Sequence, residues 1–111
     1  MVMDRWVIVR GCRFPPKPGD NIIGRDPSAQ AWLDDVGVSR RHARVAVTDS
    51  TSQIEDLGSK NGTYLRGVRV VEPIALRNGD VIRVGPVTVV YRMDAAGMTT
   101  ETNSVSVEPS R

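Results

Sequence analysis

The sequence predicts an all-β fold in which short antiparallel strands pack as a sandwich or barrel. Segments rich in valine, isoleucine and threonine recur along the chain, and residues that favour turns separate them. Between Trp6 and Arg92, glycine, proline or polar clusters interrupt almost every stretch in which apolar residues lie three and four positions apart. Helices are therefore disfavoured, and the regular spacing of short strands is typical of antiparallel β-sandwiches and barrels.

Six segments have the residue pattern of a strand and are bounded by turn residues. They are RWVIVR (5–10), NIIGR (21–25), HARVAVT (42–48), QIEDL (53–57), DVIRV (80–84) and VTVVYR (87–92). The turns between them are PPKPGD, RDPS, TDSTS, GSKNG, RNGD and GP, and we interpret RNGD at residues 77–80 as a hairpin turn. Trp6 and Trp32 fall within predicted strands, so packing in the core is favoured over stacking on nucleic-acid bases.

Length and composition predict one globular domain with a tail. The 111 residues suffice for a single core, and the apolar stretch near the start is too short for a signal peptide or a membrane span. We therefore expect a cytoplasmic protein, with a domain at residues 1–93 and a flexible Ser/Thr-rich tail or linker at 94–111. Cys12 has no second cysteine to pair with and is expected at a strand end.

The segment GVSRRHARV, residues 37–45, gathers a serine, three arginines and the only histidine of the chain. Such a cluster could hold a nucleic-acid backbone, form a catalytic serine with its base, or bind a single phosphate group. Net charge is only +2, with 15 basic and 13 acidic residues, so bulk charge does not choose between these functions. The acidic pair Asp34 and Asp35 has no further spaced oxygen ligands and is interpreted as a solvated turn, with no metal site expected.

The residues of three unusual loops favour binding of a single phosphate group. Loops of a sandwich gather at the ends of its sheets, so Arg25, Ser39 and the segment GSKNGT (58–63) can converge. Arg25 offers a planar fork of donors, Ser39 a hydroxyl and Lys60 an ammonium group, which together suit a phosphate monoester. Asn61 both donates and accepts, which suits the backbone of an extended peptide, and the following glycine favours a turn.

The same residues give weaker support to two alternative functions. A catalytic Ser39 and His42 pair lacks any nearby signature of a nucleophile elbow or an orienting acid, so catalysis is not favoured. His42, Arg44 and Ala46 are expected on one strand face, with His42 bonding loop backbone. A nucleic-acid-binding β-domain using Arg25, Arg40, Arg41 and Arg44 stays open, although no aromatic residues are interleaved with these arginines.

Four motifs together resemble one known family. They are IIGRDP, GVSRRHARV, EDLGSKNGTYLRGVRV and LRNGDVIRVG, in order and correctly spaced, and the similarity runs from about Arg5 to Arg92. The sequence is similar to forkhead-associated (FHA) domains. This resemblance implies a sandwich of two antiparallel sheets with about eleven short strands, whose apical loops bind phosphothreonine in partner proteins without catalytic activity or a cofactor.

The resemblance also implies roles for individual residues. Phosphate contacts would come from Arg25 and Ser39, with Lys60 as a further candidate, and the peptide backbone would be held by Arg40 and Asn61. Four residues would support the loops: Gly24, His42, Gly62 and Thr63.

Two further expectations concern the partner. Arg66 and Arg69 in the loop YLRGVR would favour acidic residues after the phosphothreonine. The tail contains Thr99, Thr100 and Thr102 in a partly acidic stretch, so a phosphorylated tail could occupy the domain's own binding site at high effective concentration.

Overall fold

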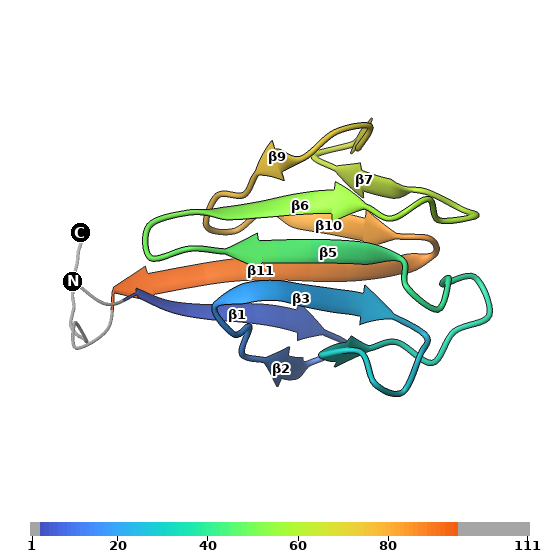
Figure 1. The fold of residues 1–111 in the computed structure, drawn as a ribbon, viewed down its shortest axis with the longest axis horizontal. Helices are drawn as coiled ribbons and strands as arrows, with labels where there is room; N and C mark the ends of the chain where they lie inside the picture. Colours follow the sequence, from blue (N-terminus) through green and yellow to red (C-terminus); the bar gives the residue numbers. More distant parts are fainter. Residues whose placement is uncertain (1–2, 96–111) are drawn as a thin grey trace.

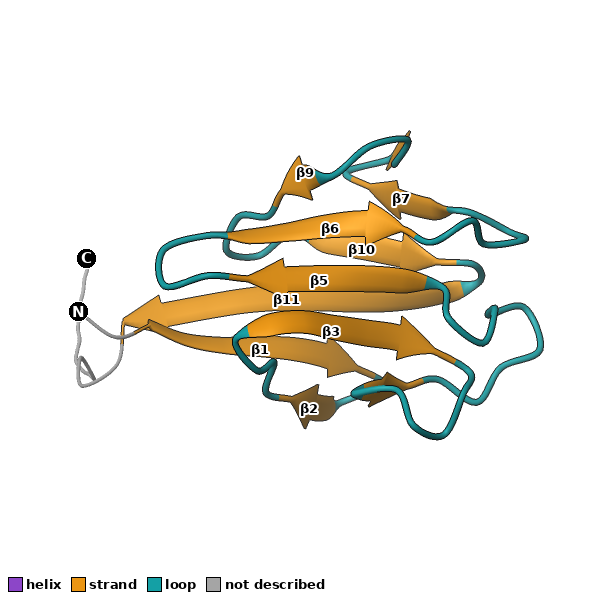
Figure 2. Cartoon of the chain, in the orientation of Figure 1, coloured by secondary structure: helices purple, strands orange, loops and turns teal. Residues whose placement is uncertain are grey.

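The computed structural model describes residues 3–95 and contains only strands, turns and loops over that range (Figure 2). The predicted all-β sandwich is confirmed. None of the described residues forms a helix, so none forms one long and apolar enough to cross a membrane.

Eleven strands form two sheets. The six-stranded sheet, in the order β2-β1-β11-β10-β7-β8, contains β1 (Met3–Val9), β2 (Cys12–Phe14), β7 (Thr63–Leu65), β8 (Val68–Arg69), β10 (Val81–Val84) and β11 (Val87–Ala95). The five-stranded sheet, in the order β4-β3-β5-β6-β9, contains β3 (Gly19–Gly24), β4 (Ala31–Trp32), β5 (Ala43–Val47), β6 (Ser52–Asp56) and β9 (Ile74–Ala75). Neighbouring strands are antiparallel except for the short parallel pair β3 and β4.

The core lies between the sheets because alternate residues of each strand point inward. On β5, Ala43, Val45 and Val47 are buried, whereas the residues between them are partly exposed. One polar contact crosses the core, where the hydroxyl of Tyr91 on β11 donates to Ser52 Oγ on β6 at 2.7 Å. This bond satisfies a buried hydroxyl that would otherwise oppose folding.

All six segments predicted as strands are strands, with ends shifted by up to three residues. The six predicted segments leave out β2, β4, β7, β8 and β9, which have only two or three residues and so show no alternation to detect. Cys12 is exposed and begins β2, as expected for a residue at a strand end.

The two tryptophans are not core residues, contrary to the sequence prediction. Trp6 is partly buried on the outer face of β1, because its neighbours Val7 and Val9 take inward positions. Trp32 is 47% exposed beside the loops. The turn at 77–80 exists, with the Asp80 amide donating to the Arg77 carbonyl at 3.0 Å, but it joins β9 and β10 of different sheets and is therefore not a hairpin.

The loops between β3 and β4, between β4 and β5, and between β6 and β7 lie together at one end of the sandwich, on the right in Figure 1. We call this the apical end. Strand β11 runs to Ala95, two residues beyond the predicted domain boundary. Thr99, Thr100 and Thr102 lie outside the described residues, so the proposed role of the tail stays a prediction.

Candidate functional site

Arg25 directly follows β3, at a point where two segments of the backbone cross at close range. A Cβ built at Gly24 would lie 2.7 Å from the carbonyl carbon of Arg40 and would overlap the carbonyl oxygen, so only glycine fits there. The crossing is held by the Arg25 amide, which donates to the Ser39 carbonyl at 3.0 Å. The side chain of Arg25 donates from Nε to the Val38 carbonyl at 3.0 Å, which orients its guanidinium group along the loop.

Ser39 and Lys60 join the second and third apical loops. The backbone amide of Lys60 donates to Ser39 Oγ at 3.0 Å, although the two residues are 21 positions apart. As an acceptor in this bond, the Ser39 hydroxyl keeps its own proton free for donation to a ligand. The side chain of Lys60 is exposed at the same edge.

His42 lies beneath the loops and is fully buried. Its Nδ1 accepts from the backbone amide of Ser39 at 3.0 Å, and its Nε2 lies 2.8 Å from the Gly62 carbonyl oxygen. Because the amide can only donate and the carbonyl can only accept, the ring is the neutral tautomer with its proton on Nε2. Both ring nitrogens therefore bind loop backbone, and neither contacts Ser39 Oγ.

The expected placement of His42 on a strand face with Arg44 and Ala46 is wrong. Strand β5 begins at Ala43, one residue later, so His42 does not follow the alternation of the strand. Arg44 and Ala46 point outward from the five-stranded sheet, whereas the histidine turns beneath the apical loops.

Asp56, at the end of β6, organises the third loop and was not among the predicted site residues. One carboxylate oxygen accepts from Ser59 Oγ at 2.5 Å and from Thr63 Oγ1 at 2.7 Å. The other accepts from the amides of Gly58 and Ser59 at 3.0 and 3.1 Å. Burial would raise the pKa of Asp56, but these hydrogen bonds, led by that from Ser59, hold it below its ordinary value.

The serine three positions after Asp56 is the sequence signal for this arrangement, since aspartate side chains often cap the backbone two or three residues ahead. Ser59 in turn accepts at Oγ from the Gly62 amide at 3.0 Å. Gly62 has a φ of 84°, a conformation that favours glycine, and Thr63 begins β7 fully buried. Hydrogen bonds thus hold the third apical loop at both its start and its end.

Asn61 projects from the same loop toward the second one. Its Nδ2 donates to the Gly37 carbonyl at 2.8 Å, and the side chain is otherwise exposed. Gly37 packs against the β10–β11 turn, where a Cβ would lie 2.6 Å from Pro86 Cδ. Asp35 fixes the start of this stretch by accepting from the Gly37 amide at 2.8 Å.

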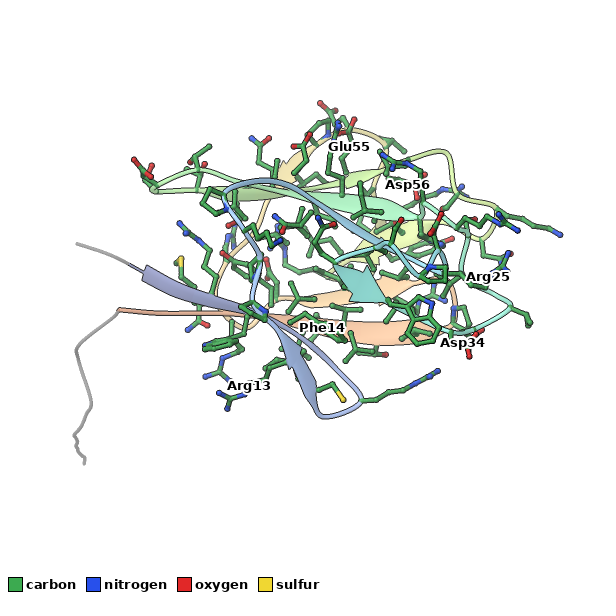
Figure 3. The ribbon with its side chains drawn as sticks, turned by 60° about the horizontal axis from the view of Figure 1, so that its bottom comes forward. Arg13, Phe14, Arg25, Asp34, Glu55 and Asp56 are labelled. Carbon is green, nitrogen blue, oxygen red and sulfur yellow. The ribbon has the colours of Figure 1, made fainter. Side chains whose placement is uncertain are left out.

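An open pocket of about 290 Å³ lies beside Arg25. Its lining comprises Arg25, Asp26, Pro27, Trp32, Asp34 and Arg40. Trp32 donates from Nε1 to the Arg25 carbonyl at 3.0 Å, and Figure 3 shows Arg25 and Asp34 at the apical end. Hydrogen bonds from Ser28, with help from Arg40 and Arg41, lower the pKa of Asp26, so the pocket carries both charges near neutral pH.

The four arginines of the nucleic-acid alternative do not line one surface. Arg44 points away from the apical loops, on the outer face of the five-stranded sheet, where it forms ion pairs with Glu55 and Asp20. Hydrogen bonding to Glu55 raises the pKa of Arg44 further above its already high value. This distribution does not favour nucleic-acid binding.

Arg66 and Arg69, which were expected to favour acidic residues of the partner, make different contacts. Arg66 has a φ of 50° in the β7–β8 turn and donates to the buried carboxylate of Asp80 at 2.7 Å, so it is committed within the fold. Arg69 is exposed, and its guanidinium carbon lies 3.4 Å from the position that a Cβ of Gly62 would take. Only Arg69 is therefore placed beside the third apical loop.

Comparisons with a family model and with known proteins agree on one family. The family model for the FHA domain matches residues 21–85. The FHA domain-containing protein FhaA of Mycobacterium tuberculosis is 41% identical over 83 residues, covering 75% of this chain and 16% of FhaA. The glycogen accumulation regulator GarA of Mycolicibacterium smegmatis is 38% identical over 81 residues, covering 73% of this chain and 51% of GarA.

A solved FHA domain has the same architecture. It comes from a structural and functional analysis of phosphothreonine-dependent FHA domain interactions, with a TM-score of 0.76 and 33% identity over 88% of this chain and 99% of that chain. The present chain spans about half the length of GarA and a smaller part of FhaA.

Proposed function

This chain belongs to the FHA domain family, a family of phosphothreonine-peptide-binding modules, and we propose that it binds such peptides through the apical residues described above. Arg25, Ser39 and Lys60 would contact the phosphate, and Arg40 and Asn61 would hold the peptide backbone. Gly24, His42, Gly62 and Thr63 would keep the three loops in register.

The observation that carries this proposal is the bond between the Lys60 amide and Ser39 Oγ, together with the anchoring of Arg25 on the Val38 carbonyl. These contacts bring three donors from separate loops to one edge. Anchoring through Nε leaves the terminal nitrogens of Arg25 available for two phosphate oxygens, which is the strongest geometry for arginine and phosphate. Asn61 keeps its side-chain oxygen to accept from a peptide amide.

A single phosphate suits this edge better than a chain of phosphates. Asp26 and Asp34 line the same pocket as Arg25 and Arg40, and their carboxylates would repel a nucleic-acid backbone that continued past the first phosphate. The engagement of both His42 nitrogens with backbone also leaves Ser39 without a general base, which supports a binding module over an enzyme.

GarA is named as a regulator, and we propose that this domain is likewise the sensor part of a regulatory protein. Charge-assisted hydrogen bonds contribute about 1.5 to 3 kcal/mol each, and ordering a flexible peptide opposes them, so a Kd on the order of micromolar is expected. The cytoplasmic location expected from the sequence stays a prediction.

Fluorescence anisotropy with degenerate phosphothreonine, phosphoserine and unphosphorylated peptide libraries tests this function. We expect binding to phosphothreonine, and a loss of about tenfold to a hundredfold in Arg25→Ala. Arg77→Ala is the matched control, because Arg77 is exposed on the β9–β10 loop at the other end of β10. Equal affinity for all three libraries would contradict the proposal.

A further inference from the structure

The outer face of the six-stranded sheet carries arginines that form no ion pair with any side chain that the structure describes. Among the residues whose side chains the structure describes, ion pairs involve Arg10, Arg44 and Arg66. The arginines of the outer face have no such pair. They are Arg13, Arg69, Arg83 and Arg92.

Strand register aligns part of this face into a row near the apical end. Arg69 lies opposite Tyr64, Tyr64 opposite Arg83, and Arg83 opposite Thr88, so the row crosses four neighbouring strands. The guanidinium carbon of Arg83 lies 4.2 Å from the centre of the Tyr64 ring. An aromatic ring holds the arginine in place, while the N–H groups at the edge of the guanidinium group remain free to bind an acceptor.

The other part of the face repeats this arrangement on β2, β1 and β11. Arg13 lies over the ring of Trp6, 5.4 Å from its centre, and Trp6 lies opposite Arg92. With Ile8, these residues line an open pocket of about 120 Å³. In Figure 3, Arg13 projects from the side of the sandwich opposite to Glu55.

The face is continuous with the apical loops. A Cβ built at Gly62 would lie 3.1 Å from the Tyr64 ring and 3.4 Å from the guanidinium carbon of Arg69, so the row begins beside Asn61. With strands about 4.8 Å apart, the face extends about 24 Å from β8 to β2, and about seven extended residues would cross it.

We propose that this face binds an acidic, extended segment of the same partner polypeptide that carries the phosphothreonine. The proposal rests on the proposed function, because the apical loops supply the first anchor. Charge complementarity identifies the occupant: Arg13, Arg69 and Arg83 form no ion pair with a described side chain, and aromatic rings lie beside Arg13 and Arg83. The register places Asp4 and Asp94 at the end of the face away from the apical loops. Tethering makes the second contact intramolecular, so weak ion pairs become effective.

The test compares phosphothreonine peptides that share one core. The core is measured alone, with seven alternating Asp and Ser residues added before or after it, and with the same additions carrying Asn for Asp. We expect one acidic addition to tighten binding about tenfold over its Asn counterpart at low salt, with the gain falling as salt rises.

The gain should disappear in the double variant Arg13→Gln/Arg83→Gln, which leaves the core affinity unchanged. The double variant Lys17→Gln/Arg77→Gln removes the same charge from exposed loops away from this face and should keep the gain. Thermal unfolding reports whether the variants fold. If the first double variant is unfolded, Arg83→Gln and Arg92→Gln replace it singly, each expected to remove part of the gain.

The proposal is overturned if neither acidic addition tightens binding, or if both double variants keep the gain equally. Tighter binding of a single-stranded oligonucleotide, lost in Arg13→Gln/Arg83→Gln, would reassign the face to nucleic acid. Failure of the core peptide to bind would instead contradict the proposed function. The unphosphorylated acidic peptide would then test the face alone, and its failure to bind in preference to the Asn peptide would overturn this inference too.

Discussion

The apical end and the outer face of the five-stranded sheet both carry charged side chains, but different interactions hold them. At the apical end, His42 and Thr63 are fully buried and bind backbone or Asp56. On the outer face, Arg44 and Glu55 are about one-third exposed, and Asp20 is 61% exposed. Buried hydrogen bonds are costly to break, whereas exposed ion pairs exchange readily with water, so the buried polar contacts of the apical end contribute more to stability than the ion pairs of the outer face.

The largest effect is expected at the backbone crossing. Gly24→Ala would force a Cβ against the carbonyl of Arg40, and we expect about 3 kcal/mol less free energy of unfolding, with loss of phosphopeptide binding. Gly67→Ala is the control, because Gly67 has a φ of 81° but nothing within 4 Å of its Cβ position. Strain alone should cost about 1 kcal/mol there. Equal losses in urea unfolding would show that the crossing imposes no steric constraint.

A smaller effect is expected at Asp56. Asp56→Asn replaces an accepting oxygen by a donating NH₂ group that must face hydroxyl or amide donors, so we expect about 2 kcal/mol less stability. Asp49→Asn, at an exposed loop position, should change stability by less than about 0.5 kcal/mol. Similar urea midpoints for both variants would indicate that the Asp56 contacts do not stabilise the third loop.

The pH dependence of stability distinguishes the Asp56 contacts from the exposed ion pairs. The pKa of Asp56 is lower in the folded protein than its ordinary value of 3.8, so the folded state binds fewer protons than the unfolded state. Its contribution is complete above that ordinary value and is lost as pH falls through the depressed folded pKa. The stability difference between wild type and Asp56→Asn should therefore narrow below about pH 4 in thermal unfolding. A constant difference down to pH 2 would exclude this carboxylate as its source.

The smallest effect on stability is expected on the outer face of the five-stranded sheet. Arg44→Gln removes the ion pairs with Glu55 and Asp20, and we expect less destabilisation than in Asp56→Asn, decreasing with added salt. Phosphopeptide affinity should not change, because Arg44 lies outside the apical end. A reduction in affinity comparable to that of Arg25→Ala would instead place Arg44 in the binding site. Anisotropy at two salt concentrations measures both responses.

The longer strands and the glycine turns could be predicted from local chemistry. In segments such as VTVVYR, apolar residues at alternate positions form one buried face. Asn61-Gly62 favours a turn because glycine adopts positive φ without strain. The two-residue strands β8 and β9 could not be predicted, since their pairing depends on neighbours far away in the chain. Trp6 and Trp32 were misplaced for a related reason: hydrophobicity does not specify which face of a strand is covered.

Local sequence is enough to show which donor groups are present at the apical end and that they lie on loops between β-strands. Resemblance to FHA domains also assigned their expected roles in binding. How the loops are held became visible only in the folded chain, in the Gly24 crossing, the tautomer of His42 and the four bonds to Asp56. These contacts join residues up to 20 positions apart, and hydrogen bonding depends on distance and direction that no local pattern encodes.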